Sequence, residues 1–452
     1  MNILVINGSP KGKHSITLQT VNYLEILHPE HHFSMLHAGQ TIKLLEKDFS
    51  PALTALQAAD VLLFSYPVYT FIAPSQLHRF IELVKESGIN LSGKYASQIT
   101  TSKHFYDTTA HRYIQDNCAD LGLRYISGLS ADMEDLTHEK GQKEAEAFFD
   151  FLIWNVEHGF YERPNVTRTD YTPVPVTVPV CPNESKTGNV VIVADVRESD
   201  AQLQRMIDRF RAVSPQKTTV VNIREYPFKG GCLGCFHCAV SGKCIYTDGF
   251  DAYLRGQIQT ADAIVYAFAI QDHSMGSRFK MYDDRQFCNG HRTVTTGMSI
   301  GYLISGELKQ EENLRTIIEA RAQVGSNFLA GIATDEENPD AEIDQLSQRL
   351  TYAMEKKYLP PQNFYGVGGM KIFRDLIWQM QGMMKADHKF YKEHGLYDFA
   401  QKQRGRMLAM YLVGAMLSSQ KLQKKMGSAM TEGMLMPYNK VLEKARKQME
   451  NQ

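Results

Sequence analysis

The sequence lacks the features of several large classes of protein. Its formal net charge is only −1 over 452 residues, so no global electrostatic field attracts nucleic acid. Its longest wholly apolar stretch, Met407 to Leu417, is far shorter than a membrane span. No basic leader with an apolar signal core precedes the first strand. We therefore expect a soluble, cytoplasmic protein with no transmembrane segment and no nucleic-acid partner.

Two nucleotide-binding motifs are also missing from the first loop, INGSPKGKHSIT at residues 6–17. The P-loop has four residues between its glycines and then Gly-Lys-Ser/Thr, but only three separate Gly8 from Gly12, and His14 replaces the hydroxyl. The dinucleotide fingerprint G-x-G-x-x-G is absent, because Ser-Pro follows Gly8. A strand, a hydroxyl-rich loop and a helix remain, which suit a single phosphomonoester. A surface turn that binds nothing is the alternative. The candidate phosphate ligands are Ser9, Ser15 and Thr17, with Lys11 or Lys13 as counter-charge.

Cysteine is too scarce for a disulfide framework, and four of the 7 cysteines crowd into residues 232–244. This suggests a metal site in a reducing compartment. Structural zinc usually takes its ligands as two separated pairs, whereas three close cysteines and a fourth nearby fit the corners of a [4Fe–4S] cubane. Zinc, a redox disulfide and reduced structural thiols remain alternatives. The candidate ligands, in the pattern C-x2-C-x2-C-x5-C, are Cys232, Cys235, Cys238 and Cys244. We expect the others to be buried as small apolar residues: Cys118, Cys181 and Cys288.

Apolar strands alternate with helical patterns up to a last helix from about Glu139 to Val156, which predicts a parallel sheet covered by helices. Residues 161–187 then contain five prolines. Proline cannot enter a central strand or a helix interior, so we interpret this stretch as an extended linker. The expected strands are Met1–Asn7, His32–Leu36, Val61–Tyr66, Ala96–Thr101 and Arg124–Ile126.

The same pattern returns after the linker. GNVVIVAD echoes MNILVIN, with Asn189 matching Asn2 at an offset of 187, and TADAIVYAFA echoes AADVLLFSYP, with Ala261 matching Ala59 at an offset of 202. The repeat has gained 15 residues between these landmarks, and the gained interval holds the cysteine loop. We therefore expect a duplicated α/β domain, with chance similarity between two α/β domains as the alternative.

These motifs together carry a family resemblance. NGSPKGKHSIT and SYPVYTFIAPSQLHRFIELV (residues 65–84) resemble the phosphate loop and flavin loop of flavodoxin-like NAD(P)H-dependent FMN reductases and quinone reductases. GCLGCFHCAVSGKC resembles the cluster motif of iron-sulfur flavoproteins. The resemblance covers about residues 1–335. It implies two tandem flavodoxin-like, doubly wound parallel-sheet domains, with FMN at the carboxyl ends of the strands.

By position, the resemblance also implies a set of FMN ligands. The FMN phosphate would be held by Ser9, Lys11, Ser15 and Thr17. The isoalloxazine would be flanked by Pro67, Val68, Tyr69, Thr70 and Phe71. The loop that would close over the ring consists of Thr101, Ser102, Lys103 and His104. Tyr69 and Phe71 could equally be core aromatics, and His104 a solvated loop residue. No residue is nominated as a general acid or base.

The second repeat departs from this pattern. Its first loop, ADVRESDAQ, places Asp195, Glu198 and Asp200 where a phosphate should lie, and these carboxylates would repel it. Its third-strand loop keeps Lys280 and Asp284-Arg285 in a family-like frame but has lost Pro-Val-Tyr. We infer that this domain has no FMN of its own. Because the resemblance implies dimers in which the cluster of one subunit lies near the flavin of another, the fused pair could place flavin on domain 1 and cluster on domain 2.

The end of the chain differs from both repeats. Residues 358–452 hold 12 of the 20 methionines. From Pro361 onward, the chain has 15 Lys and Arg residues but only 7 Asp and Glu residues. We expect a helical, basic appendage running to Met449 that caps the flavin site or pairs chains into a homo-oligomer. The basic residues around Met407 to Leu417 permit a membrane-surface helix, although a solvated face is favoured.

The sequence thus predicts four segments: an FMN-binding domain at 1–160, the linker at 161–187, a second domain with the four-cysteine loop at 188–357, and the appendage at 358–452. The predicted function is an FMN-dependent oxidoreductase in which NAD(P)H or a low-potential donor reduces FMN, and a [4Fe–4S] cluster passes electrons singly to a small-molecule or protein acceptor. One alternative is an NAD(P)H quinone or nitroaromatic reductase whose cysteines hold zinc or nothing. Another is a non-catalytic electron carrier or redox sensor.

Overall fold

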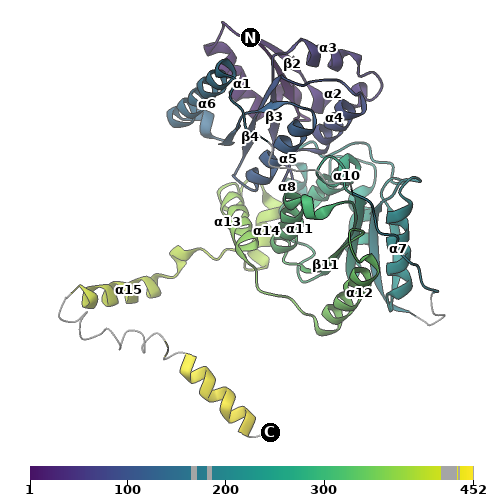
Figure 1. Ribbon diagram of the computed structural model, residues 1–452. Coiled ribbons are helices and arrows are strands. Elements are labelled where there is room, and N and C mark those ends of the chain that lie inside the picture. The colour runs from purple at the N-terminus through teal and green to yellow at the C-terminus, as the bar shows by residue number, and fades with distance from the viewer. Residues whose placement is uncertain (164–170, 181–185, 419–434, 436–437, 451–452) are drawn as a thin grey trace. The chain divides into compact units, whose positions relative to one another are not determined.

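The computed structural model describes residues 1–163, 171–180, 186–418, 435 and 438–450. The chain forms two compact units, Met1–Tyr391 and Lys392–Gln452. The first unit contains two β-sheets with their covering helices (Figure 1). We refer to the parts built on these two sheets as domain 1 and domain 2.

The sheet of domain 1 is parallel, with the strand order β2-β1-β3-β4-β5. This is the flavodoxin-like order, as expected. Residues Ile3 to Ile6 are buried throughout, because helices cover both faces of a doubly wound sheet. The strands are β1 (Asn2–Asn7), β2 (His32–Leu36), β3 (Val61–Pro67), β4 (Tyr95–Ser102), β5 (Arg124–Tyr125) and β6 (Leu129–Asp132), which pairs with β4. The helices are α1 (Ile16–Leu27), α2 (Ala38–Leu45), α3 (Ser50–Ala58), α4 (Ser75–Glu86), α5 (Asp107–Asp120) and α6 (Glu139–His158).

The sheet of domain 2 is also parallel and has the order β11-β10-β9-β7-β8. Counted from the first strand of the domain, this is again the flavodoxin-like order, which supports the predicted duplication. The strands are β7 (Thr187–Asp195), β8 (Gln216–Asn222), β9 (Ala263–Ala269), β10 (Ser299–Ser305) and β11 (Phe328–Thr334). The helices are α7 (Ala201–Val213), α8 (His237–Ser241), α9 (Phe250–Tyr253), α10 (Gly276–Arg285), α11 (Glu312–Val324) and α12 (Pro339–Lys356). The two-domain α/β fold class is confirmed.

Local sequence accounts for where several of these helices begin and end. Pro339 opens α12, a position where its missing N–H would be unpaired in any case and its fixed φ suits the first turn. Gly159 ends α6 with a φ of 72°, a left-handed conformation that costs glycine little.

The two domains meet through the inner face of each sheet. Helix α4 packs against α10, and one continuous hydrophobic core holds residues of both domains, among them Phe80 and Phe279. The outer faces have separate cores, with Val21 of α1 in one and Ile207 of α7 in the other. Since α4 and α10 are equivalent helices of the repeat, each domain offers the same surface to its neighbour, as in a twofold dimer.

Residues 171–180 contain neither helix nor strand, as their prolines predict, but they pack on domain 2. Val176 is buried. The N–H of Val174 donates to the carbonyl of Asp335 at 2.8 Å, and the Tyr171 hydroxyl donates to the Asp335 carboxylate. The linker therefore follows the carboxyl end of β11. Cys181 lies outside the described residues, and the predicted domain limits stay predictions.

The remaining helices are α13 (Phe364–Gln379), α14 (Lys385–Glu393) and α15 (Arg404–Leu417), and residues 438–450 are helical as well. Helix α13 packs against α11 within the first unit. In the second unit, α15 has exposed apolar side chains such as Leu408 and Tyr411. Part of the run predicted to continue to Met449 lies outside the described residues.

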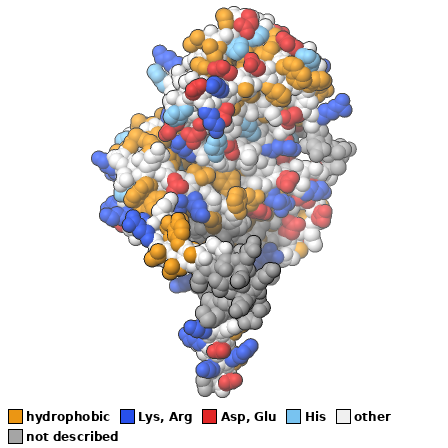
Figure 2. All heavy atoms as spheres, turned by 90° about the vertical axis from the view of Figure 1, so that its left-hand side faces the viewer, with side chains coloured by type: hydrophobic (Ala, Val, Ile, Leu, Met, Phe, Trp, Pro, Cys, Tyr) orange, Lys and Arg blue, Asp and Glu red, His pale blue; other side chains and the backbone are white. Residues whose placement is uncertain are grey.

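The surface and the helices agree with the low net charge and the short apolar runs of the sequence. Acidic and basic side chains are interspersed on the face that Figure 2 draws. Within the described ranges, no helix is both long and apolar enough to cross a membrane.

Candidate functional site

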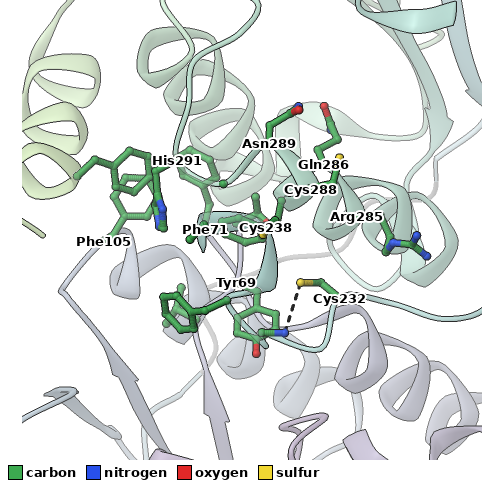
Figure 3. A pocket seen from close by; sticks show the side chains of 18 of the residues that line it. Tyr69, Phe71, Phe105, Cys232, Cys238, Arg285, Gln286, Cys288, Asn289 and His291 are labelled. Carbon is green, nitrogen blue, oxygen red and sulfur yellow. Dashed lines mark hydrogen bonds between the residues drawn. The ribbon is translucent and has the colours of Figure 1, made fainter. Parts of the chain in front are cut away.

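A cavity of about 360 Å³ lies between the carboxyl edge of the domain 1 sheet and the cysteine loop of domain 2. Figure 3 shows Tyr69 and Phe71 of domain 1 beside Cys232 and Cys238 of domain 2 at this cavity. Every residue of the implied FMN set lines it except His104, and all four clustered cysteines line it as well. Lys11 lines the cavity, whereas Lys13, the alternative counter-charge, does not. Residues from two distant motifs of the sequence therefore meet at one site.

The first loop is shaped by the last residue of β1. The Asn7 side chain donates to the carbonyl of Gly12 at 2.9 Å and accepts from the N–H of Ser9 at 3.1 Å. Gly12 has a φ of 53°, which lets the loop fold back before α1. Ser15 precedes α1, but its hydroxyl makes no capping hydrogen bond. The Ser15 hydroxyl and the N-terminus of α1 are thus available to an anion.

The loop after β3 is a tight turn. Tyr69 and Ile72 exchange backbone hydrogen bonds at 2.8 and 3.2 Å, and between them Thr70 and Phe71 have φ values of 44° and 73°. No acceptor among the described residues takes the backbone N–H of Thr70 or Phe71. Both residues line the cavity, so the turn leaves two donors there for a ligand.

The cysteine loop also depends on left-handed backbone. Gly234 has a φ of 59°, and a Cβ there would lie 1.8 Å from the hydroxyl oxygen of Tyr69. Only glycine therefore lets the cysteine loop approach the loop after β3 this closely. The Gly234 N–H donates to the sulfur of Cys232 at 3.4 Å (Figure 3).

Two of the four cysteines, Cys232 and Cys238, lie in surroundings that favour the neutral thiol when no metal is bound. Burial raises the pKa of Cys238 to about 11 and raises that of Cys232 further. Over the described part of the chain, no three His, Cys, Asp or Glu side chains are placed to hold one metal ion. A metal ligand must be a thiolate, so metal binding here would release protons.

Arg285 anchors the cysteine loop to α10. It is buried and donates to both carboxylate oxygens of Asp248 at 2.8 Å and to the carbonyl of Gly230 at 2.9 Å. Burial raises the pKa of Asp248, but the hydrogen bonds and charge of Arg285 outweigh it and lower that pKa to about 2. The Arg285 guanidinium also lies 4.4 Å from the ring centroid of Tyr246.

An aromatic wall closes the cavity on the side of α13. Phe105 lies 5.0 Å from Phe71 and 4.4 Å from Phe373, measured between ring centroids. The Tyr106 hydroxyl donates to the carbonyl of Tyr365 at 2.8 Å. Helix α13, from the predicted appendage, thus contributes to the cavity; no motif marked Phe373 or Phe105 for this role.

His104 lies apart from the other predicted ligands. It has a φ of 54°, its side chain is 53% exposed, and its Nδ1 pairs with the Asp107 carboxylate at 2.8 Å. Lys103, which does line the cavity, pairs with Asp132 at 2.8 Å. The loop after β4 therefore sends these two side chains in different directions.

The corresponding edge of domain 2 is occupied by its own side chains. Asp195, at the end of β7, is buried and pairs with Arg224 at 2.6 Å. Arg197 donates to Gln271, in the loop after β9. Asp195, one of the three carboxylates that we expected to repel a phosphate, is thus paired with a cation of its own domain.

Comparisons with known proteins agree with this architecture. Residues 1–147 match a family described as having a flavodoxin-like fold. An iron-sulfur flavoprotein of Archaeoglobus fulgidus is 27% identical over 175 residues, which are 36% of this chain and 78% of that protein.

Solved structures give weaker matches. An FMN-dependent NADH-azoreductase from Bacillus anthracis in complex with FMN is 14% identical, with a TM-score of 0.28 over 33% of this chain and 98% of that chain. An NAD(P)H:quinone oxidoreductase from Methanothermobacter marburgensis is 13% identical, with a TM-score of 0.28 over 36% and 99%. From its strand order and the family match, domain 1 has the flavodoxin-like fold, and the chain is similar to an iron-sulfur flavoprotein.

Proposed function

We propose that the protein is an FMN-dependent oxidoreductase that takes electrons from NAD(P)H, with FMN on domain 1 and a [4Fe–4S] cluster in the cysteine loop of domain 2. The observation that carries this proposal is that the predicted FMN loops and all four clustered cysteines line one cavity. Bound FMN would supply the exchange between two-electron hydride chemistry and one-electron iron chemistry.

The residues of domain 1 have distinct roles in this proposal. The hydroxyls of Ser9 and Ser15 and the N-terminus of α1 bind the phosphate, with Lys11 as its counter-charge. The free N–H groups of Thr70 and Phe71 donate to the polar edge of the ring. The aromatic wall excludes water from the ring, and a drier site strengthens these hydrogen bonds.

The four cysteines suit a cubane better than zinc. Each cysteine of a cubane binds a different iron, so its sulfurs need not converge on one point, whereas a zinc ion needs four ligands around itself. The spacing of Cys232, Cys235 and Cys238, with Cys244 nearby, matches the ligands of a cubane rather than the two separated pairs that structural zinc takes. The N–H of Gly234 already donates to Cys232, and hydrogen bonds to sulfur tune the potential of a cluster.

The relatives support the same pairing of cofactors. The similar protein from Archaeoglobus fulgidus carries the name iron-sulfur flavoprotein. By analogy with that name, we assign both cofactors to this chain, while the acceptor and the choice between NADH and NADPH are left open.

The deciding experiment is purification without oxygen, followed by counts of FMN, iron and sulfide per chain. We expect about one FMN, about four iron atoms and about four sulfides per chain, with a broad absorbance at about 400 nm that bleaches on reduction. FMN without iron after anaerobic reconstitution would leave a simple flavin reductase. If NAD(P)H is not oxidised when ferricyanide is present, the protein is a carrier or sensor instead.

A further inference from the structure

Helix α10 of domain 2 carries two charged side chains that hold the loop after β3 of domain 1. Lys280 and Asp284 are both 0% exposed. The Lys280 ammonium donates to the carbonyl of Tyr69 at 2.9 Å and to the Thr70 hydroxyl oxygen at 3.0 Å. The Asp284 carboxylate accepts from the Thr70 hydroxyl at 2.7 Å and from the N–H of Ser75 at 2.8 Å. Lys280 and Asp284 also bind each other. Both ends of the loop are thus fixed by the other domain.

The reverse contact shows that this arrangement belongs to the duplication. At the offset of 202, Glu82 of α4 corresponds to Asp284, and Ser277 corresponds to Ser75. The Glu82 carboxylate accepts from the N–H and the hydroxyl of Ser277, each at 2.6 Å. Each domain therefore holds the equivalent loop of its neighbour, but only the loop of domain 1 lines the cavity.

The contact on the side of the cavity also carries more charge. Lys280 lies 3.4 Å from Asp283, and Asp283 pairs with Arg321. With Asp284, these are two cations and two anions, and Arg321 lines the cavity. Charges away from water interact more strongly and over longer distances than charges in solvent, so removal of one member leaves a net charge that a cofactor in the cavity would sense.

We propose that Lys280 and Asp284 are positioning residues for FMN, which fix the conformation of the loop after β3 and set the potential of the bound flavin. They hold Thr70 and Phe71 in the left-handed backbone that keeps their N–H groups free. Lys280 also polarises the peptide between Tyr69 and Thr70, and a polarised peptide has a stronger N–H donor. This inference rests on the proposed FMN site.

The test compares two neutralising variants of the full chain, Lys280→Met and Asp284→Asn. Both should bind FMN roughly tenfold more weakly, because Lys280→Met removes two hydrogen bonds to the loop and Asp284→Asn replaces one of two accepting oxygens by an amide nitrogen that cannot accept. Their potentials should move in opposite directions. Lys280→Met leaves an unbalanced anion that opposes reduction, whereas Asp284→Asn leaves an unbalanced cation that favours it. A tenfold change in relative affinity for reduced and oxidised FMN corresponds to about 30 mV in the two-electron midpoint potential.

Two controls separate this role from a merely structural one. Glu82→Gln removes the equivalent contact on the other side of the interface and should leave FMN affinity and potential at the wild-type values. Lys280→Arg keeps the charge and should bring the potential back close to that of the wild type.

The inference would be overturned if the midpoint potential shifted in the same direction in Lys280→Met and Asp284→Asn, or shifted in neither. An equal shift of the potential in Glu82→Gln would overturn it as well. If Lys280→Met does not fold, the potential of Asp284→Asn is compared with that of the Glu82→Gln control. A potential that is higher in Asp284→Asn supports the inference, and one that is equal or lower overturns it. A wild-type protein that binds no FMN would overturn the proposed function itself and this inference with it.

Discussion

The loops after β3 and β9 have the same backbone in different surroundings. In each, two consecutive residues have positive φ, Thr70 and Phe71 in domain 1, Asp272 and His273 in domain 2. The loop of domain 1 lines the cavity, whereas the loop of domain 2 does not. A shared backbone turn is therefore not enough to make a cofactor site.

The side chains make the difference. Phe71 and His273 occupy the same position at the offset of 202. Phe71 presents an aromatic face to the cavity, while His273 lies 3.0 Å from the Asp120 carboxylate and 2.9 Å from that of Glu311. After duplication, one copy of the turn thus faces a cavity and the other joins the domains through ion pairs.

The largest expected effect tests whether the cluster belongs to domain 2 and FMN to domain 1. Cys232→Ala should lower the iron content from about four per chain to near zero, because a cubane needs all four thiolates to be held firmly. FMN content should stay unchanged, since its proposed ligands lie on domain 1. The measurement is iron and FMN per chain after anaerobic reconstitution. Cys118→Ala, a change at a buried cysteine of domain 1, is the control and should keep its iron; full iron in Cys232→Ala would remove the cluster from domain 2.

The next effect concerns the ion pairs of the loop after β9. Burial lowers the pKa of His273, but the hydrogen bonds and charges of Asp120 and Glu311 raise it to about 9. Since this lies above the unfolded value of 6.5, the stabilisation is complete below that value and is lost as the pH rises through about 9. The loss should approach about 3 kcal/mol.

Urea unfolding at about pH 7 and about pH 10 measures this loss. The variant His273→Gln should be less stable than the wild type at the lower pH, with a difference that narrows at the higher pH. An undiminished difference at the higher pH would mean that His273 is not charged in the folded protein.

The sequence anticipated those parts of the fold and site that depend on local pattern. Strands such as β1 and β3 are buried on both faces, and such strands are continuous apolar runs that can be recognised without a structure. Strand β6 (Leu129–Asp132) was not predicted, because its apolar and polar residues alternate over only four positions, with Leu129 as the single large apolar side chain. The proposed FMN ligands followed from the resemblance of the loops after β1, β3 and β4 to those of flavin reductases.

Other parts of the site depend on packing between residues far apart in the chain. Phe373 reaches the cavity from α13, and Lys280 contacts a loop that is 211 residues away in sequence. The family-like frame included Lys280 without giving it a role. No local pattern encodes such contacts, because they arise when elements far apart in the sequence pack together.

A smaller effect sharpens the comparison of the first loops. At the offset of 187, Glu198 occupies the position of Lys11. Lys11→Met should weaken FMN binding roughly tenfold, because a charge-assisted hydrogen bond to phosphate is lost. Glu198→Gln should leave both the affinity and the single FMN per chain unchanged. Fluorescence titration of the FMN-free protein measures the affinity and the number of FMN molecules bound per chain. A weaker affinity in Glu198→Gln would assign an FMN to domain 2.

The smallest effect is expected at His104, which the sequence placed over the flavin ring and the structure places outside the cavity lining. Exposed ion pairs contribute about 0–1 kcal/mol, so His104→Gln should change FMN affinity by less than about twofold. The matched variant in the same loop is Thr101→Val, because Thr101 lines the cavity and its hydroxyl lies 2.6 Å from that of Thr17. That variant should weaken FMN binding more than His104→Gln does, since it leaves a buried hydroxyl without its partner. If His104→Gln has the larger effect instead, the loop after β4 closes when FMN binds, and its left-handed turn at His104 is the hinge of that movement.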